Sequence, residues 1–139
     1  MRWLLVLWVA CLLPVGGQTQ GEPPGPLVRE QVKALQAEKA ARTPAERKLA
    51  SRLVHALRMF RGRPIARGVP RLRTGVVWDA LGRTEVDVRA RVTPGLIARV
   101  EALGGEIVSA FPAYDALRAH LHASALELLA ASPEVRGIR

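Results

Sequence analysis

Alternating apolar and polar residues in the C-terminal half of the chain are typical of a strand with one buried face. From Thr84 to Val92 the alternation has no interruption. Because successive side chains of a strand point to opposite faces, one face belongs to a core and the other faces water or a partner. The apolar face carries Val86, Val88, Ala90 and Val92, and the charged face carries Glu85, Asp87, Arg89 and Arg91.

Helix and strand patterns follow this strand in regular succession. Each expected helix begins at a polar residue and ends at glycine or proline, which are common stop signals. A short strand over 76–78 and a turn over 79–82 are expected before the alternating strand. The elements expected after it are a helix from Thr93-Pro94 to Gly104-Gly105, a strand over 106–111, a turn over 112–115, a strand over 116–121, a helix from Ser124 to Pro133 and a strand over 135–138.

The order strand, helix, strand, strand, helix, strand predicts an α+β fold of the ferredoxin-like βαββαβ type over residues 74–139. Two helices then cover one face of the sheet, and the other face stays open. The charged side chains of that open sheet face are the candidate partner-binding residues, namely Glu85, Asp87, Arg89, Arg91, Arg118 and His120.

The first 17 residues have the pattern of an export signal. A basic Arg2 precedes an apolar run over 3–13, and Pro14–Gly17 interrupts it. This is typical of a secretory signal peptide cleaved after Gly17, and the run is shorter than the roughly 20 residues of a membrane span. The alternative is a buried N-terminal helix, which the Pro-rich residues that follow disfavour. We expect a secreted or periplasmic protein that meets the membrane only through this signal.

Cys11 is the only cysteine of the 139 residues. Lipoprotein anchoring at Cys11 is not expected, because Trp8 and the apolar Leu12-Leu13 match a lipidation signal poorly. The remaining chain has no cysteine. The exported protein is therefore expected to lack disulfides and to rely on its apolar core.

A basic, helical extension precedes the predicted module. Residues 18–26 form a Pro/Gly linker, 27–60 a helical extension, and 61–73 a basic linker that we expect to be exposed and mobile. Thr43-Pro44-Ala45-Glu46 matches a capping box with proline at the first helical position. Apolar residues at helical spacing then predict one amphipathic helix up to Phe60.

Positive charge is concentrated in this extension. Residues 28–73 contain 13 basic and three acidic groups, against seven and eight in 74–139, within a net charge of +9. Such a segment attracts polyanions. Nucleic acid is nevertheless not an expected partner, because the basic linker has no interleaved aromatic residues and the strands over 84–92 and 116–121 have none on the open face.

No catalytic or cofactor motif is present in the sequence. There is no Gly-x-Ser-x-Gly and no phosphate-binding loop. His120 and His122 lie two residues apart at the end of a strand, but no third ligand is at metal-binding spacing, so two surface histidines are the expected interpretation. We assign no catalytic residue, no cofactor and no metal to this chain.

The stretch from Val86 to Arg139 resembles the N-terminal pro-domain of secreted subtilisin-like serine proteases. The resemblance rests on the order of Thr93-Pro94, a helix ending in Leu103-Gly104-Gly105, the run Phe111-Pro112-Ala113-Tyr114-Asp115-Ala116-Leu117, and the ending Pro133-Glu134-Val135-Arg136-Gly137-Ile138. It implies a ferredoxin-like propeptide that assists folding of the protease and inhibits it, with the catalytic domain as a partner in cis or in trans.

Two features depart from the family. The Asp, His and Ser motifs of the catalytic domain are absent, and the sequence stops at Arg139, where family members continue into a tail that occupies the protease cleft. We therefore expect a non-catalytic propeptide or inhibitor-like module on a truncated or fragmentary chain. The alternative is a free-standing secreted interaction or inhibitor module.

Overall fold

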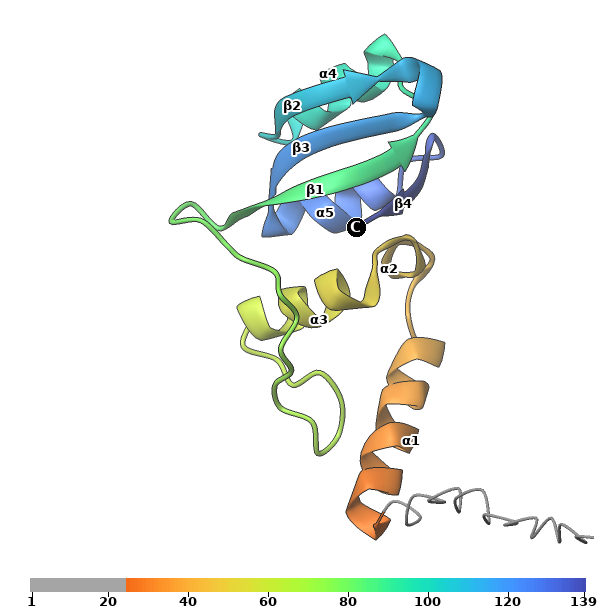
Figure 1. Ribbon diagram of the computed structural model, residues 1–139, viewed down its shortest axis with the longest axis vertical. Coiled ribbons are helices and arrows are strands. Elements are labelled where there is room, and N and C mark those ends of the chain that lie inside the picture. The colour runs from red at the N-terminus through yellow and green to blue at the C-terminus, as the bar shows by residue number, and fades with distance from the viewer. Residues whose placement is uncertain (1–24) are drawn as a thin grey trace, which may run out of the picture.

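A computed structural model describes residues 25–139 (Figure 1). The expected signal peptide over 1–17, its cleavage after Gly17, the lipidation question at Cys11 and nearly all of the Pro/Gly linker lie outside the described residues. The described part is an α+β structure with one four-stranded antiparallel sheet, as the sequence predicts.

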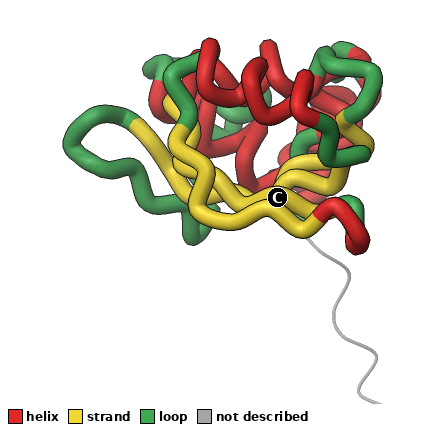
Figure 2. Tube along the Cα trace, turned by 90° about the horizontal axis from the view of Figure 1, so that it is seen from above, coloured by secondary structure: helices red, strands yellow, loops and turns green. Residues whose placement is uncertain are grey.

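The sheet is built from the C-terminal half of the chain. Its strands lie side by side in the order β2-β3-β1-β4, and every pairing is antiparallel. The helices α4 and α5 lie on the same side of this sheet, as the view in Figure 2 shows. The bounds are β1 Arg83–Ala90, α4 Pro94–Ala102, β2 Glu106–Phe111, the 3-10 turn η1 Pro112–Tyr114, β3 Ala116–His122, α5 Ala123–Ala130 and β4 Val135–Ile138.

The helix α4 begins and ends at the residues expected from the sequence. The Thr93 hydroxyl accepts a hydrogen bond of 3.1 Å from the backbone N–H of Leu96. Gly104 follows the helix with φ of +73°, a conformation that side chains disfavour. The next residue, Gly105, donates its backbone N–H to the carbonyl of Val100 at 2.9 Å. The chain thus turns directly from α4 into β2.

Replacing Gly105 by alanine is expected to destabilise this turn by about 1–3 kcal/mol, because overpacking displaces the core. A Cβ atom there would lie 2.6 Å from Leu121 Cδ2 and 2.8 Å from the Val100 carbonyl oxygen. Gly104→Ala is the comparison, since it meets no atom within 4 Å and only strains the backbone. Urea unfolding of both variants measures the difference, and a larger loss for Gly104→Ala would contradict this packing.

Three helices precede the sheet, and one expectation about them is wrong. They are α1 Pro26–Ala40, α2 Pro44–Lys48 and α3 Ser51–Phe60. The capping box is confirmed, since Thr43 and Glu46 exchange both of its hydrogen bonds. The single helix expected from residue 44 to 60 is broken at Leu49, which is extended. The break lets Leu49 bridge Ile138 on β4, and the N–H of Ala50 donates to the Ile138 carbonyl at 2.8 Å.

The strand expected over 76–78 is also absent: β4 pairs with the outer edge of β1 only along Val88–Ala90, and residues 76–78 do not pair with the rest of that edge. Trp78 instead packs against the core from an irregular segment, while Val77 is exposed. The turn after it is present, and Asp79 accepts from the backbone N–H groups of Leu81 and Arg83. The strand β1 ends at Ala90 instead of Val92, since the chain turns there toward the cap of α4.

The core joins the N-terminal helices to the sheet. From α3, buried residues reach the same apolar cluster as the inner residues of the sheet and of α5. The basic linker is less exposed than expected, because Ile65 and Val69 are buried, although all five of its arginines are exposed. The shared cluster includes Leu53, Val54, Leu57, Val86, Val88, Leu117, Leu121, Leu126 and Leu129.

Candidate functional site: the open sheet face

The open sheet face is the side of the sheet that α4 and α5 do not cover. Burial alternates along β1 and β3, with every second residue buried and those between them partly or fully exposed. The strand register sets Glu85 opposite His120 and Asp87 opposite Arg118. Four of the six residues predicted from sequence therefore lie in two adjacent cross-strand pairs.

Charges on this face are paired with one another. The Arg118 Nε lies 2.8 Å from Asp87 Oδ1 and 3.7 Å from Glu85 Oε1, and His120 Nε2 lies 3.8 Å from Glu85 Oε2. The hydrogen bond with Asp87 raises the pKa of Arg118 above its usual value. All four side chains are between a third and a half exposed, so these pairs contribute little to folding stability. They remain accessible to a partner.

The remaining two predicted residues lie apart from this cluster. Arg89 is exposed near the end of β1, opposite Ala116, and Arg91 follows after the strand has ended. Phe111 of β2 also pairs with Ala116 and is 51% exposed. An aromatic ring thus lies on the open sheet face, which sequence reasoning missed because it considered only the strands over 84–92 and 116–121.

A second group of charges is buried between α1 and α3, and we call it the Glu38 cluster. The Glu38 carboxylate accepts two hydrogen bonds of 2.9 Å from the Arg42 guanidinium and lies 3.1 Å from Arg58 Nη2. His55 Nε2 lies 3.5 Å from Glu38 Oε2 and 3.2 Å from Arg42 Nη2. The i, i+4 spacing of Glu38 and Arg42 was the only sequence signal for it.

The arrangement of the Glu38 cluster is that of a structural contact. Arg42 also donates to the Ser51 hydroxyl at 3.0 Å, and Arg58 donates to the Ile65 carbonyl at 2.7 Å. Every charge therefore has a partner from a neighbouring element. Burial alone would raise the pKa of Glu38, but the hydrogen bond and charge of Arg42, with the charge of Arg58, outweigh it and lower the pKa. The cluster anchors the C-terminal end of α1.

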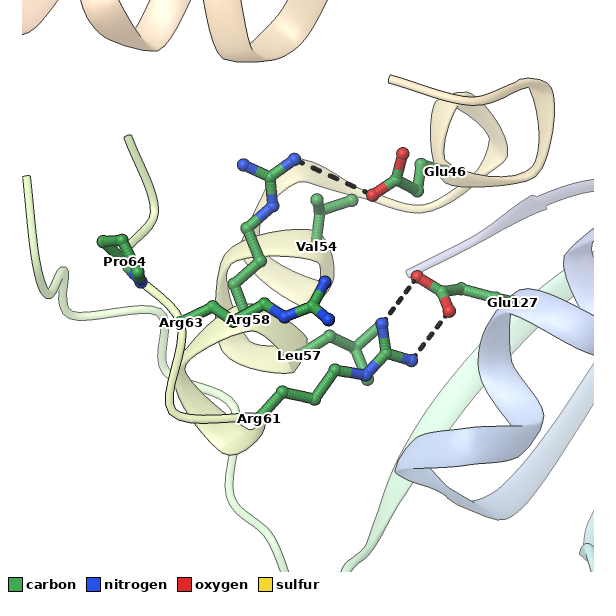
Figure 3. A pocket seen from close by; sticks show the side chains of 8 residues that line it. All are labelled: Glu46, Val54, Leu57, Arg58, Arg61, Arg63, Pro64 and Glu127. Atoms are coloured by element: carbon green, nitrogen blue, oxygen red, sulfur yellow. Dashed lines mark hydrogen bonds and ion pairs between the residues drawn. The ribbon is translucent and has the colours of Figure 1, made fainter. Parts of the chain in front are cut away.

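A small pocket opens between α3 and α5 (Figure 3). Its volume is about 210 Å³. Figure 3 shows the Arg61 guanidinium reaching Glu127 from below, and both of its contacts are hydrogen bonds, of 3.1 and 2.7 Å. Arg58 approaches Glu46 at 3.8 Å on the other side. Because these charges already neutralise one another, we interpret the pocket as part of the contact between the N-terminal helices and α5.

The histidines have structural contacts of their own. His122 accepts a hydrogen bond from the backbone N–H of Ser124 through Nδ1 and so caps α5, one residue before the expected start. No group of three or more metal-ligating side chains occurs in residues 25–139. Within the same residues no helix is long and apolar enough to cross a membrane.

Comparisons with known proteins find no relative. No protein-family model matches the chain, and no match is found among the curated proteins or the solved structures.

Proposed function

We propose that this protein is a non-catalytic, propeptide-like module that binds the catalytic domain of a secreted subtilisin-like serine protease through its open sheet face, in cis or in trans. The observation that supports this most is the order of elements together with the sheet order β2-β3-β1-β4. Both orders support the ferredoxin-like arrangement that the family resemblance implies. The proposal includes export, for which the support is the sequence pattern of residues 1–17.

The chemistry of the open sheet face favours a protein partner. It combines a half-exposed aromatic ring at Phe111 with the mixed charges of Glu85, Asp87 and Arg118. Aromatic residues and arginine are enriched at protein interfaces and carry much of their binding energy. Surface ion pairs can also exchange their partners at little cost to folding. A surface with this combination of side chains fits another folded protein better than a small molecule.

An inhibition assay tests this proposal. The full chain is mixed with the catalytic domain of a bacterial subtilisin, and hydrolysis of a chromogenic peptide is followed. We expect dose-dependent inhibition, weakened about tenfold or more in the double variant Phe111→Ala/Arg118→Ala, which corresponds to about 1.4 kcal/mol or more of binding free energy. Both positions are exposed, so circular dichroism should show an unchanged fold.

Arg99→Ala is the matched control, because Arg99 is an exposed residue of α4, the helix on the covered side of the sheet. Its inhibition constant should equal that of the unmodified chain. If the Phe111→Ala/Arg118→Ala variant inhibits the protease as strongly as the unmodified chain, the open sheet face is not the binding surface. Absence of any inhibition or binding would favour the alternative, a free-standing interaction module with a different partner.

A further inference from the structure

A groove lies between the C-terminal end of α3 and the irregular segment that leads into β1. We call it the Trp78 groove, and its volume is about 590 Å³. The rings of Phe60 and Trp78 lie 5.0 Å apart at an angle of 47° and form part of its wall. Apolar side chains from both segments continue this wall, namely Ala56, Met59, Pro64, Pro70 and Val76. The groove therefore offers a place for an apolar side chain of a ligand.

Two arginines line the same groove, and no acidic residue does. Arg63 and Arg71 are both exposed, and neither guanidinium group forms a hydrogen bond or ion pair with any residue in the range 25–139; the backbone N–H of Arg63 donates to the Arg58 carbonyl at 2.8 Å. Acids of nearby segments are already engaged, since Asp79 is bound by Arg83 at 2.9 Å and Glu127 by Arg61 at 2.7 Å. Two guanidinium groups thus remain available beside an apolar wall.

We propose that the Trp78 groove binds an acidic peptide segment that carries a large apolar side chain. The apolar side chain would lie against Phe60 and Trp78, and carboxylates on either side of it would pair with Arg63 and Arg71. Guanidinium groups bind carboxylates through paired, charge-assisted hydrogen bonds. An anchor residue in a pocket with complementary charges at its rim is a common design of peptide-binding sites.

Charge and ring geometry favour a peptide over the other class of polyanion, a single-stranded nucleic acid. Residues 28–73, which contribute much of this side of the groove, carry 13 basic and three acidic groups, so an acidic partner of either class is attracted. Base stacking, however, needs an open ring face. Trp78 is partly buried against Phe60, and the ring of His122 lies edge-on to Phe60 at 6.2 Å. Phe60 is 46% exposed, so the pair offers one ring for stacking and not the series of rings that successive bases need.

Fluorescence of Trp78 tests the proposal directly. Trp3 and Trp8 are the only other tryptophans, so the full chain with Trp3→Phe and Trp8→Phe reports from the groove alone. The probe is the blocked peptide Asp-Glu-Leu-Phe-Asp-Glu, titrated at about 0.15 M salt, where long-range attraction is screened. We expect a saturable change in emission. The peptide Asn-Gln-Leu-Phe-Asn-Gln should bind about tenfold more weakly or worse, since it lacks the carboxylates.

Two double variants with the same change in net charge separate the groove from the general basic surface. Arg63→Gln/Arg71→Gln should weaken binding about tenfold or more, whereas Arg67→Gln/Arg73→Gln should change it less than about threefold. Arg67 and Arg73 belong to the same linker and are exposed, but neither lines the groove.

Four results would overturn the proposal. If both double variants weaken peptide binding equally, binding depends only on the net charge of the protein. Equal binding of the neutral peptide would exclude a role of the arginines, and absence of any saturable change would exclude the groove. Tighter binding of an oligothymidine of eight nucleotides than of the acidic peptide would assign the groove to nucleic acid instead. None of these results depends on whether the open sheet face binds a protease.

Discussion

Leu57→Ala is expected to lower the free energy of unfolding by about 2–5 kcal/mol, because it removes a buried side chain and leaves a cavity. Leu57 belongs to α3 and is 2% exposed within the apolar cluster that also includes the inner residues of the sheet. A small domain is only marginally stable, so a loss of this size unfolds a large fraction of the molecules. Urea denaturation followed by circular dichroism measures the change.

Leu128→Ala is the control for this prediction. Leu128 is of the same residue type and lies on α5, but it is 55% exposed, so its loss should cost less than about 0.5 kcal/mol. Hydrogen exchange in α3 and in β1 should accelerate together in Leu57→Ala. If exchange accelerated in α3 alone, the N-terminal helices would be a separate unit that unfolds independently of the sheet.

Glu38→Gln is expected to cost about 3–5 kcal/mol, since it leaves the buried Arg42 without its counter-charge. The Arg42 side chain is 5% exposed and the Glu38 side chain 3% exposed. Because α1 is held mainly at this end, part of the loss should appear as release of α1. Hydrogen exchange should therefore accelerate in α1 more than in the sheet. The control is Glu30→Gln, which removes the same charge from an exposed position on α1.

The same variant should change the dependence of stability on pH. The pKa of Glu38 is lowered on folding from 4.5, with burial opposed by the hydrogen bond and charge of Arg42 and by the charge of Arg58. The ionised carboxylate therefore stabilises the fold fully above its pKa in the unfolded chain, and this contribution is lost as the pH falls through the pKa in the folded state. The unmodified chain and Glu38→Gln should differ most near neutral pH and converge in acid. A difference that stays constant down to pH values of about 2 would contradict this linkage.

Local patterns in the sequence predicted the sheet well and the N-terminal half less well. The alternation around Val88, the cap at Thr93 and the turn at Gly104 each depend on neighbouring residues, so their elements could be predicted from the sequence alone. The break at Leu49 could not, because it depends on Ile138 at the other end of the chain. Periodicity reports which side of a helix is apolar but not which backbone groups a distant strand requires.

The candidate site, too, has features that local sequence patterns predict and features that depend on distant residues. The charged residues of β1 follow from period-two alternation, and Arg118 follows from the alternation of its own strand. The contact between Arg118 and Asp87 depends on the register between β1 and β3. The position of Phe111 beside Ala116 depends on the register between β2 and β3. The Trp78 groove depends on the path of a segment without regular structure, for which a sequence pattern gives no information.

The contact between Leu49 and Ile138 also constrains the order in which the chain can fold. This bridge joins a residue between α2 and α3 to the last strand, and β4 must be in place beside β1 before Ala50 can donate to it. Contacts between such distant residues raise the contact order and slow folding. On a ribosome, α3 leaves the exit tunnel long before its binding site exists. Its apolar side therefore stays accessible to chaperones at least until β4 has been made, and docking of α3 is expected to be among the last steps in the folding of residues 25–139.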